Sequence, residues 1–107
     1  MFALPIAILA LLPCSTGQAA APDKPVTHTV TIEEMQFKPA ELTVKAGDSI
    51  VWVNKDMFPH TATSKAKGFD SQQIDPEKSW TFRAVKKGVV PYVCTLHPTM
   101  RGTLRVR

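Results

Sequence analysis

The chain has 107 residues, which is enough for one domain and excludes a two-domain protein. Its 13 lysines and arginines against 9 aspartates and glutamates give a net charge of +4, which favours acidic partners. The basic residues are interspersed with acidic ones and aromatic residues make up only 7% of the chain, so nucleic-acid binding is not expected.

The segment from Phe2 to Leu12 is almost entirely apolar and is followed by small residues, which is typical of an export signal. We expect a signal peptide over residues 1–19, with cleavage after Ala19. A flexible arm over residues 20–25 would then lead into a domain over residues 26–107. The apolar run is too short to span a bilayer, so stable membrane insertion is not expected.

An alternative for this segment is a lipid anchor on Cys14, because Leu11-Leu12-Pro13-Cys14 faintly resembles a bacterial lipobox. Both interpretations place the protein in the periplasm or otherwise outside the cytoplasm.

From about Val26 the chain alternates apolar and polar residues in short runs, which is typical of a small antiparallel β domain. The pattern predicts strands at Val26–Ile32, Leu42–Val44, Ile50–Asn54, Trp80–Phe82, Val89–Cys94 and Thr103–Val106. No segment has a sustained apolar stripe of helical period, so helix is confined at most to a turn between Ser64 and Ile74. These runs indicate an all-β sandwich and not a parallel α/β fold.

Cys94 would be the single thiol left after cleavage of the signal, in a compartment where disulfides are common. One explanation is a buried structural cysteine. The other is a thiolate that binds a metal ion.

Metal-binding side chains cluster where the strand that ends at Cys94 runs out. His97 and Met100 follow Cys94 at steps of three residues, and His60 comes at the end of another predicted strand. Two imidazoles, one thiolate and a weak axial thioether are the ligand set of blue-copper electron-transfer sites. Such mixed donors suit both Cu(I) and Cu(II), so we expect one copper ion.

Zinc is the competing metal, because cysteine and histidine also bind zinc. Methionine is a poor zinc ligand, however, and structural zinc sites usually contain more thiolates. His28 has no ligand partner at useful spacing and lies in the middle of a predicted strand, so it is expected to be structural.

The segment from Cys94 to Gly102 resembles the short copper loop of amicyanins, in which Cys, His and Met are three residues apart. The segment from Trp52 to His60 is similar to the amicyanin segment that ends in the first histidine ligand. The resemblance extends from about Val30 to Val106 and implies a cupredoxin-like Greek-key β-sandwich of about seven to eight strands.

The resemblance also implies residue roles. Copper would be bound by His60, Cys94, His97 and Met100. Asn54 would tie the His60 loop to the Cys94 loop, with Thr95 as its side-chain partner. An apolar docking rim near His97 would consist of Met57, Phe58, Pro59 and Pro98.

The expected function is a monomeric one-electron carrier, not an enzyme, that works between redox proteins such as a c-type cytochrome and a dehydrogenase or reductase. The alternative is a periplasmic copper-binding or copper-delivery protein, although the Met- or His-rich tract typical of such proteins is missing. An enzyme with Cys94 as nucleophile and His97 as base is disfavoured, because no third orienting group is evident.

Overall fold

The computed structural model describes residue 3, residues 24–66 and residues 68–107. The expected signal peptide, Cys14 and most of the expected arm therefore lie outside the described residues. Lys24 and Pro25, at the end of that arm, are exposed and have no regular structure. The described segments contain no helix that is long and apolar enough to cross a membrane.

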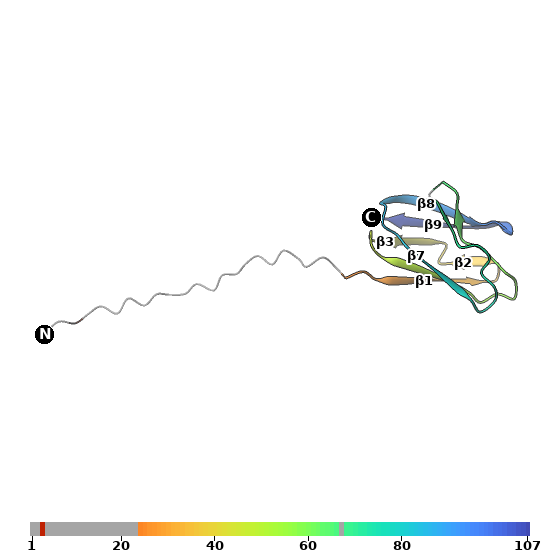
Figure 1. Cartoon of the computed structure of the whole chain (residues 1–107), viewed down its shortest axis with the longest axis horizontal. Coiled ribbons are helices and arrows are strands. Elements are labelled where there is room, and N and C mark those ends of the chain that lie inside the picture. The colour runs from red at the N-terminus through yellow and green to blue at the C-terminus, as the bar shows by residue number, and fades with distance from the viewer. Residues whose placement is uncertain (1–2, 4–23, 67) are drawn as a thin grey trace.

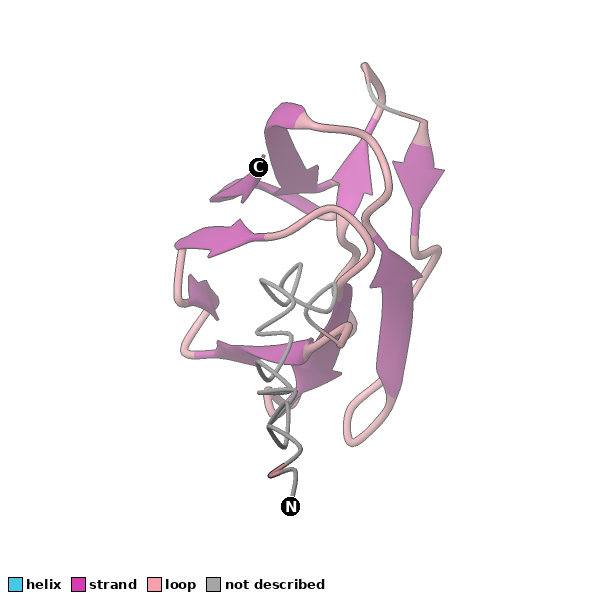
Figure 2. Ribbon diagram, turned by 90° about the vertical axis from the view of Figure 1, so that its left-hand side faces the viewer, coloured by secondary structure: helices cyan, strands magenta, loops and turns pink. Residues whose placement is uncertain are grey.

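The described residues form nine β-strands in two facing sheets (Figure 1). The strands are β1 Thr27–Glu33, β2 Gln36–Lys38, β3 Glu41–Val44, β4 Ser49–Asn54, β5 Thr63–Ser64, β6 Phe69–Asp70, β7 Ser79–Arg83, β8 Gly88–Cys94 and β9 His97–Val106. One sheet has the order β2-β1-β4-β7, and the other has the order β3-β9-β8-β5-β6. Figure 2 shows only strands and loops along the described chain, so the expected all-β sandwich is confirmed.

The sheets are mixed and not purely antiparallel as expected. β1 pairs with β4 in parallel, and β3 pairs with β9 in parallel. Parallel neighbours need a crossover, and here the chain leaves the first sheet after β2, adds β3 to the second sheet and returns as β4. The strands β5 and β6 occupy the region in which only a turn was expected, because two residues each are too few to show a period.

The core between the sheets follows from alternation along the strands. In β4 the side chains of Ile50, Trp52 and Asn54 are buried, while the residues between them are only half-buried. Trp52 is completely buried and its ring lies 5.4 Å from that of Tyr92 in the opposite sheet. Burying an apolar side chain of this size stabilises the fold by about 1.5–3 kcal/mol.

The β8–β9 hairpin ends in a tight turn of two residues, Thr95 and Leu96. Val93 pairs with Arg101, but Cys94 pairs with His97, so residues 98–100 bulge out of the ladder. The bulge lies within β9, which begins at His97 and not at Thr103 as predicted. One end of the sandwich is therefore built from a strand end, a two-residue turn and a bulge.

Candidate metal centre

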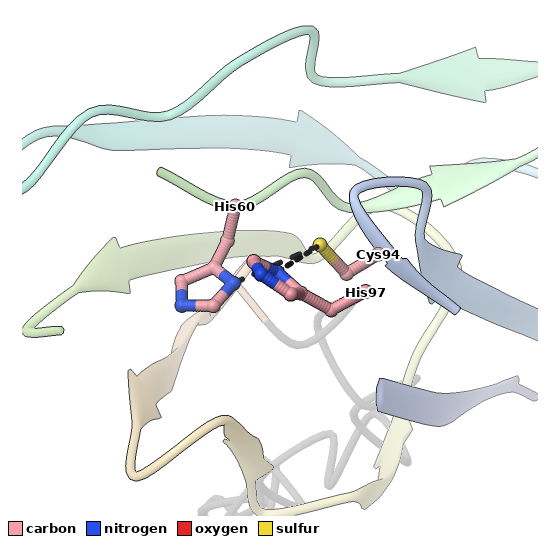
Figure 3. A group of neighbouring side chains, drawn as sticks. All are labelled: His60, Cys94 and His97. Carbon is pink, nitrogen blue, oxygen red and sulfur yellow. Dashed lines mark hydrogen bonds between the residues drawn. The ribbon is translucent and has the colours of Figure 1, made fainter. Parts of the chain in front are cut away.

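Three nitrogen and sulfur donors meet at this end of the sandwich (Figure 3). The Sγ atom of Cys94 lies 3.7 Å from Nδ1 of His60 and 3.8 Å from Nδ1 of His97. All three donor atoms lie within 4.8 Å of one another. His60 and Cys94 are completely buried, whereas His97 is half-buried.

These separations fit a shared metal ion. Donors that bind one ion in a trigonal plane, with bonds of about 2.0–2.3 Å, lie about 3.5–4.0 Å from each other. The two sulfur-to-nitrogen distances of 3.7 and 3.8 Å fall in this interval. They are also longer than ordinary hydrogen bonds between nitrogen and oxygen. The residues present therefore match a site with two imidazoles and one thiolate.

Met100 belongs to the same hairpin. It is the last residue of the bulge, and its side chain is 3% exposed. The bulge turns it into the sandwich, whereas its neighbours Pro98 and Thr99 are exposed. The fourth residue of the predicted ligand set is therefore a buried thioether on the strand that begins at His97.

The position of His60 is fixed through both its backbone and its ring. Its N–H donates to the carbonyl oxygen of Ile74 at 3.1 Å, and its carbonyl accepts from the Ile74 N–H at 2.7 Å. Its Nε2 lies 2.8 Å from Oδ2 of Asp56. Because Nε2 contacts the carboxylate, Nδ1 is the nitrogen that faces Cys94.

Asp56 also accepts hydrogen bonds from two backbone N–H groups in the turn between β1 and β2. The Glu34 N–H donates to Oδ1 at 2.8 Å, and the Met35 N–H donates to Oδ2 at 3.0 Å. Both turn residues have positive φ angles, 55° and 58°, which non-glycine residues rarely adopt. Burial raises the pKa of Asp56, but the hydrogen bonds from Met35, His60 and Glu34 outweigh it and lower the pKa below its usual value.

Sequence reasoning missed Asp56, and it also missed Thr61 beside Cys94. The Thr61 N–H donates to the Cys94 sulfur at 3.3 Å. The Thr61 hydroxyl accepts a hydrogen bond from the Thr95 N–H at 2.9 Å and lies 3.1 Å from the Thr95 hydroxyl. Thr61 therefore joins the segment after His60 to the Cys94 turn. Its only sequence signal is its place next to His60.

The expected pairing of Asn54 with Thr95 is wrong, because Thr95 bonds to Thr61 instead. Asn54 is completely buried and its Nδ2 donates to the carbonyl oxygens of Phe58 and Ile74, at 2.8 and 2.9 Å. Its Oδ1 accepts from the Asp56 N–H at 2.9 Å. Asn54 thus supports the segment that carries Asp56 and His60, and it does not bridge to the Cys94 turn.

Apolar residues that flank His60 and His97 in the sequence are exposed or half-buried. Met57 is 87% exposed and Phe58 is 57% exposed, while Pro59 is half-buried and Pro98 is exposed. Leu96 was not among the expected rim residues, yet it is 48% exposed in the turn between β8 and β9. Exposed apolar residues on both sides of the half-buried His97 in the sequence are typical of an interaction surface.

His28 lies outside the site and has a structural partner. Its Nε2 lies 2.9 Å from Oδ2 of Asp48. Asp48 also accepts hydrogen bonds from the N–H groups of Val26 and Lys45, both at 3.0 Å. The hydrogen bond from the Val26 N–H, then the His28 side chain and the Lys45 N–H, lower the pKa of Asp48 to about 2.

Known proteins are similar to this chain in sequence. A family model described as a cupredoxin-like domain matches residues 4–106. The chain is 34% identical over 99 residues to an amicyanin of Paracoccus versutus, an alignment that covers 86% of this chain and 74% of that protein. It is 29% identical over 84 residues to a plastocyanin of Scenedesmus fuscus, with 66% of this chain and 86% of that protein covered.

Solved structures agree with the sequence relatives. An oxidised amicyanin mutant has a TM-score of 0.72 at 29% identity, and the match covers 76% of this chain and 82% of the other. An amicyanin mutant described with Cu(I) has a TM-score of 0.71 at 28% identity, with the same coverage of 76% and 82%. The chain therefore belongs to the family of cupredoxin-like domains, and within it the chain is amicyanin-like, with the histidine, cysteine, histidine and methionine side chains of a type 1 copper site.

Proposed function

We propose that this protein is an exported one-electron carrier in which Cys94, His60 and His97 would hold one copper ion, with Met100 as a fourth and weaker ligand. The observation that supports this most directly is the meeting of the Cys94 sulfur with both histidine Nδ1 atoms at 3.7 and 3.8 Å. A bound copper ion would supply the exchange of one electron between Cu(I) and Cu(II). The chain has no substrate of its own.

The protein residues keep the donors in place while the charge of the site changes. His60 is held by Asp56 and by Ile74, and the Thr61 N–H stabilises the Cys94 thiolate by donating to its sulfur. Because these partners are themselves hydrogen-bonded, little has to move when an electron arrives or leaves. Mixed nitrogen and sulfur donors serve both oxidation states without a change of ligands.

His97 is the ligand through which electrons would enter and leave, because it is half-buried whereas His60 and Cys94 are completely buried. The surrounding rim of Met57, Phe58, Pro59 and Pro98, together with Leu96, would allow close and short-lived contact with a partner. The partners would be redox proteins, such as a c-type cytochrome and a dehydrogenase or reductase. The net charge of +4 would favour acidic ones.

A periplasmic location would follow from the apolar N-terminal segment, with residues 1–19 as the signal peptide and residues 26–107 as the mature domain after a short arm. A domain of this size with one metal site is expected to act as a monomer. Cleavage is tested by expressing the full chain and measuring the N-terminus and mass of the exported protein, which should start at or next to Ala20.

The ligand assignment is tested by visible spectroscopy of the mature protein with divalent copper. We expect an intense thiolate-to-copper band that ascorbate bleaches reversibly. Cys94→Ser should lose this band, whereas Met100→Leu should keep the band and shift the reduction potential. An unchanged spectrum for Cys94→Ser would refute the assignment, and colourless binding of copper by the wild-type protein would do so too.

Copper delivery is the rival function, and it makes a different prediction. A delivery protein should pass Cu(I) rapidly to a chelator or an acceptor protein, and its electron exchange should be slow. The buried Cys94 and His60 favour retention of the ion. We therefore expect the reduced protein to exchange electrons with its oxidised form much faster than it releases copper.

A further inference from the structure

A cavity of about 550 Å³ opens at the end of the sandwich that is remote from the metal centre. Residues of β8 and β9 line it, and Val90 of β8 precedes Cys94 by four residues, which is about 13 Å along a strand. Figure 1 shows the start of β8 and the C-terminus at one end of the sandwich and the β8–β9 turn at the other. The cavity is therefore separate from the copper site.

The inner walls of the cavity are apolar and come from both sheets. They include Phe69, Phe82, Ala84, Val90, Leu104 and Val106. The rings of Phe69 and Phe82 stack with centroids 4.7 Å apart, where the edge strands β6 and β7 approach each other. At the mouth Val85 is 64% exposed. Apart from the half-buried Phe82, these wall side chains are already only 1–7% exposed, so an aromatic or branched aliphatic group would mainly cover Phe82 and the exposed Val85.

The mouth of the cavity is cationic. Lys65, Lys86 and Lys87 are exposed and line it, and among the described residues no aspartate or glutamate lines the cavity. Within the described part of the chain, none of these three lysines takes part in an ion pair. Lys86 and Lys87 are adjacent in sequence, so their like charges raise the local potential and favour a bound anion.

We propose that this cavity binds a small amphipathic anion, with its apolar body against Phe69 and Phe82 and its carboxylate or sulfonate group at Lys86 and Lys87. The volume lies within the usual range for ligand pockets, about 300–1,000 Å³. A concave site with an apolar interior fits a small molecule better than the flat surface that weak protein contacts use. The site needs no copper.

The test uses the copper-loaded, ascorbate-reduced protein and 1-anilinonaphthalene-8-sulfonate, a fluorescent aromatic sulfonate. From the usual binding energy per non-hydrogen atom, we expect a Kd of about tens of micromolar. The neutral analogue N-phenyl-1-naphthylamine has a similar aromatic body without the sulfonate, and we expect it to bind about tenfold more weakly. Added salt should weaken the binding of the sulfonate only.

The test variant carries Lys86→Gln and Lys87→Gln. The matched control carries Lys38→Gln and Lys55→Gln. Both remove two positive charges, but the control lysines pair with exposed glutamates away from the cavity. We expect the first pair to weaken sulfonate binding about tenfold and the control to change it less than twofold. Urea unfolding of both variants should match the wild type, which excludes binding by a loosened fold.

The location is read from backbone amide chemical shifts of the reduced protein. Titration with the sulfonate should shift the amides of Ala84, Val85 and Val90 and leave those of Thr95 and His97 unchanged. Equal affinity for the charged and neutral probes, an unchanged Kd in the Lys86 and Lys87 variant, or shifts confined to the metal end would each overturn the proposal. Binding of an acidic phenylalanine-containing peptide without binding of the sulfonate would assign the cavity to a protein partner instead.

Discussion

Asp56→Asn isolates the contribution of one carboxylate that touches both the metal centre and the turn between β1 and β2. The asparagine keeps the size of the side chain but removes its charge and one acceptor oxygen. The carboxylate accepts from Glu34 N and Met35 N, and it contacts His60 Nε2 at 2.8 Å. The amide nitrogen of asparagine cannot accept a hydrogen bond, so at least one of these three contacts must be lost.

Two effects follow from this loss. A hydrogen bond to a charged group contributes about 1.5–3 kcal/mol, and the partial exposure of Asp56, 13% for the side chain, reduces this figure, so the unfolding free energy should fall by about 1–2 kcal/mol. The carboxylate also raises the basicity of the His60 ring. This strengthens the binding of Cu(II) more than the binding of Cu(I). If Cu(II) affinity falls tenfold more than Cu(I) affinity, the reduction potential rises by about 60 mV.

Both effects are measured on one preparation, by urea unfolding of the copper-free protein and by voltammetry of the copper-loaded protein. Glu41→Gln is the control, because it removes one negative charge from an exposed side chain that pairs with Arg105. We expect the control to change neither quantity by more than its experimental error. A lower stability of Asp56→Asn with an unchanged potential would mean that Asp56 serves the turn alone, and the inference about His60 would be refuted.

Three further predictions concern Tyr92, Gly102 and Asp48. Burial raises the pKa of Tyr92 to about 12, while the neighbouring Trp52 indole lowers this pKa. Ultraviolet titration of this single tyrosine should therefore give a midpoint near 12. The unfolding free energy should fall as the pH rises above 10, because the tyrosine of the unfolded chain ionises there first. A midpoint near 10 in the folded protein would contradict that burial. A Cβ atom on Gly102 would overlap the ring of Tyr92, so Gly102→Ala should lower the unfolding free energy by about 1–3 kcal/mol, and adding Tyr92→Leu should remove part of the loss. The pKa of Asp48 is lowered from 3.8 to about 2, so its contribution to stability is complete above pH 3.8 and is lost as the pH falls towards 2. Asp48→Asn should flatten this pH dependence in acid unfolding curves. An unchanged slope would refute the contribution of Asp48.

The predictions that were confirmed rested on local patterns in the sequence. In β1 the buried Val30 and Ile32 stand between polar residues, so its period is visible in the sequence. The strands β5 and β6 were missed because two residues each show no period. The parallel pairing of β1 with β4 was missed as well, since a strand pattern does not state which strand will be its neighbour.

The donor residues were recognisable for a similar reason. Cys94, His97 and Met100 lie within seven residues, so one hairpin with one bulge can bring them together, and residue type alone indicates the metal they suit. The groups that hold these donors were not recognisable. Asp56 meets the Glu34 N–H across 22 residues of sequence, and Thr61 meets Thr95 across 34.

The all-β class, the donor set and the net charge of the protein could be predicted from its residues, because strand period, ligand chemistry and charge are properties of residues and their near neighbours. Three features became visible in the folded protein alone: the mixed order of the sheets, the contacts of Asp56 and Thr61 with the donor residues, and the cavity behind Lys86 and Lys87. Each of these depends on contacts between segments far apart in the chain. Such contacts are selected by the packing of the whole sandwich, so no short stretch of sequence contains them.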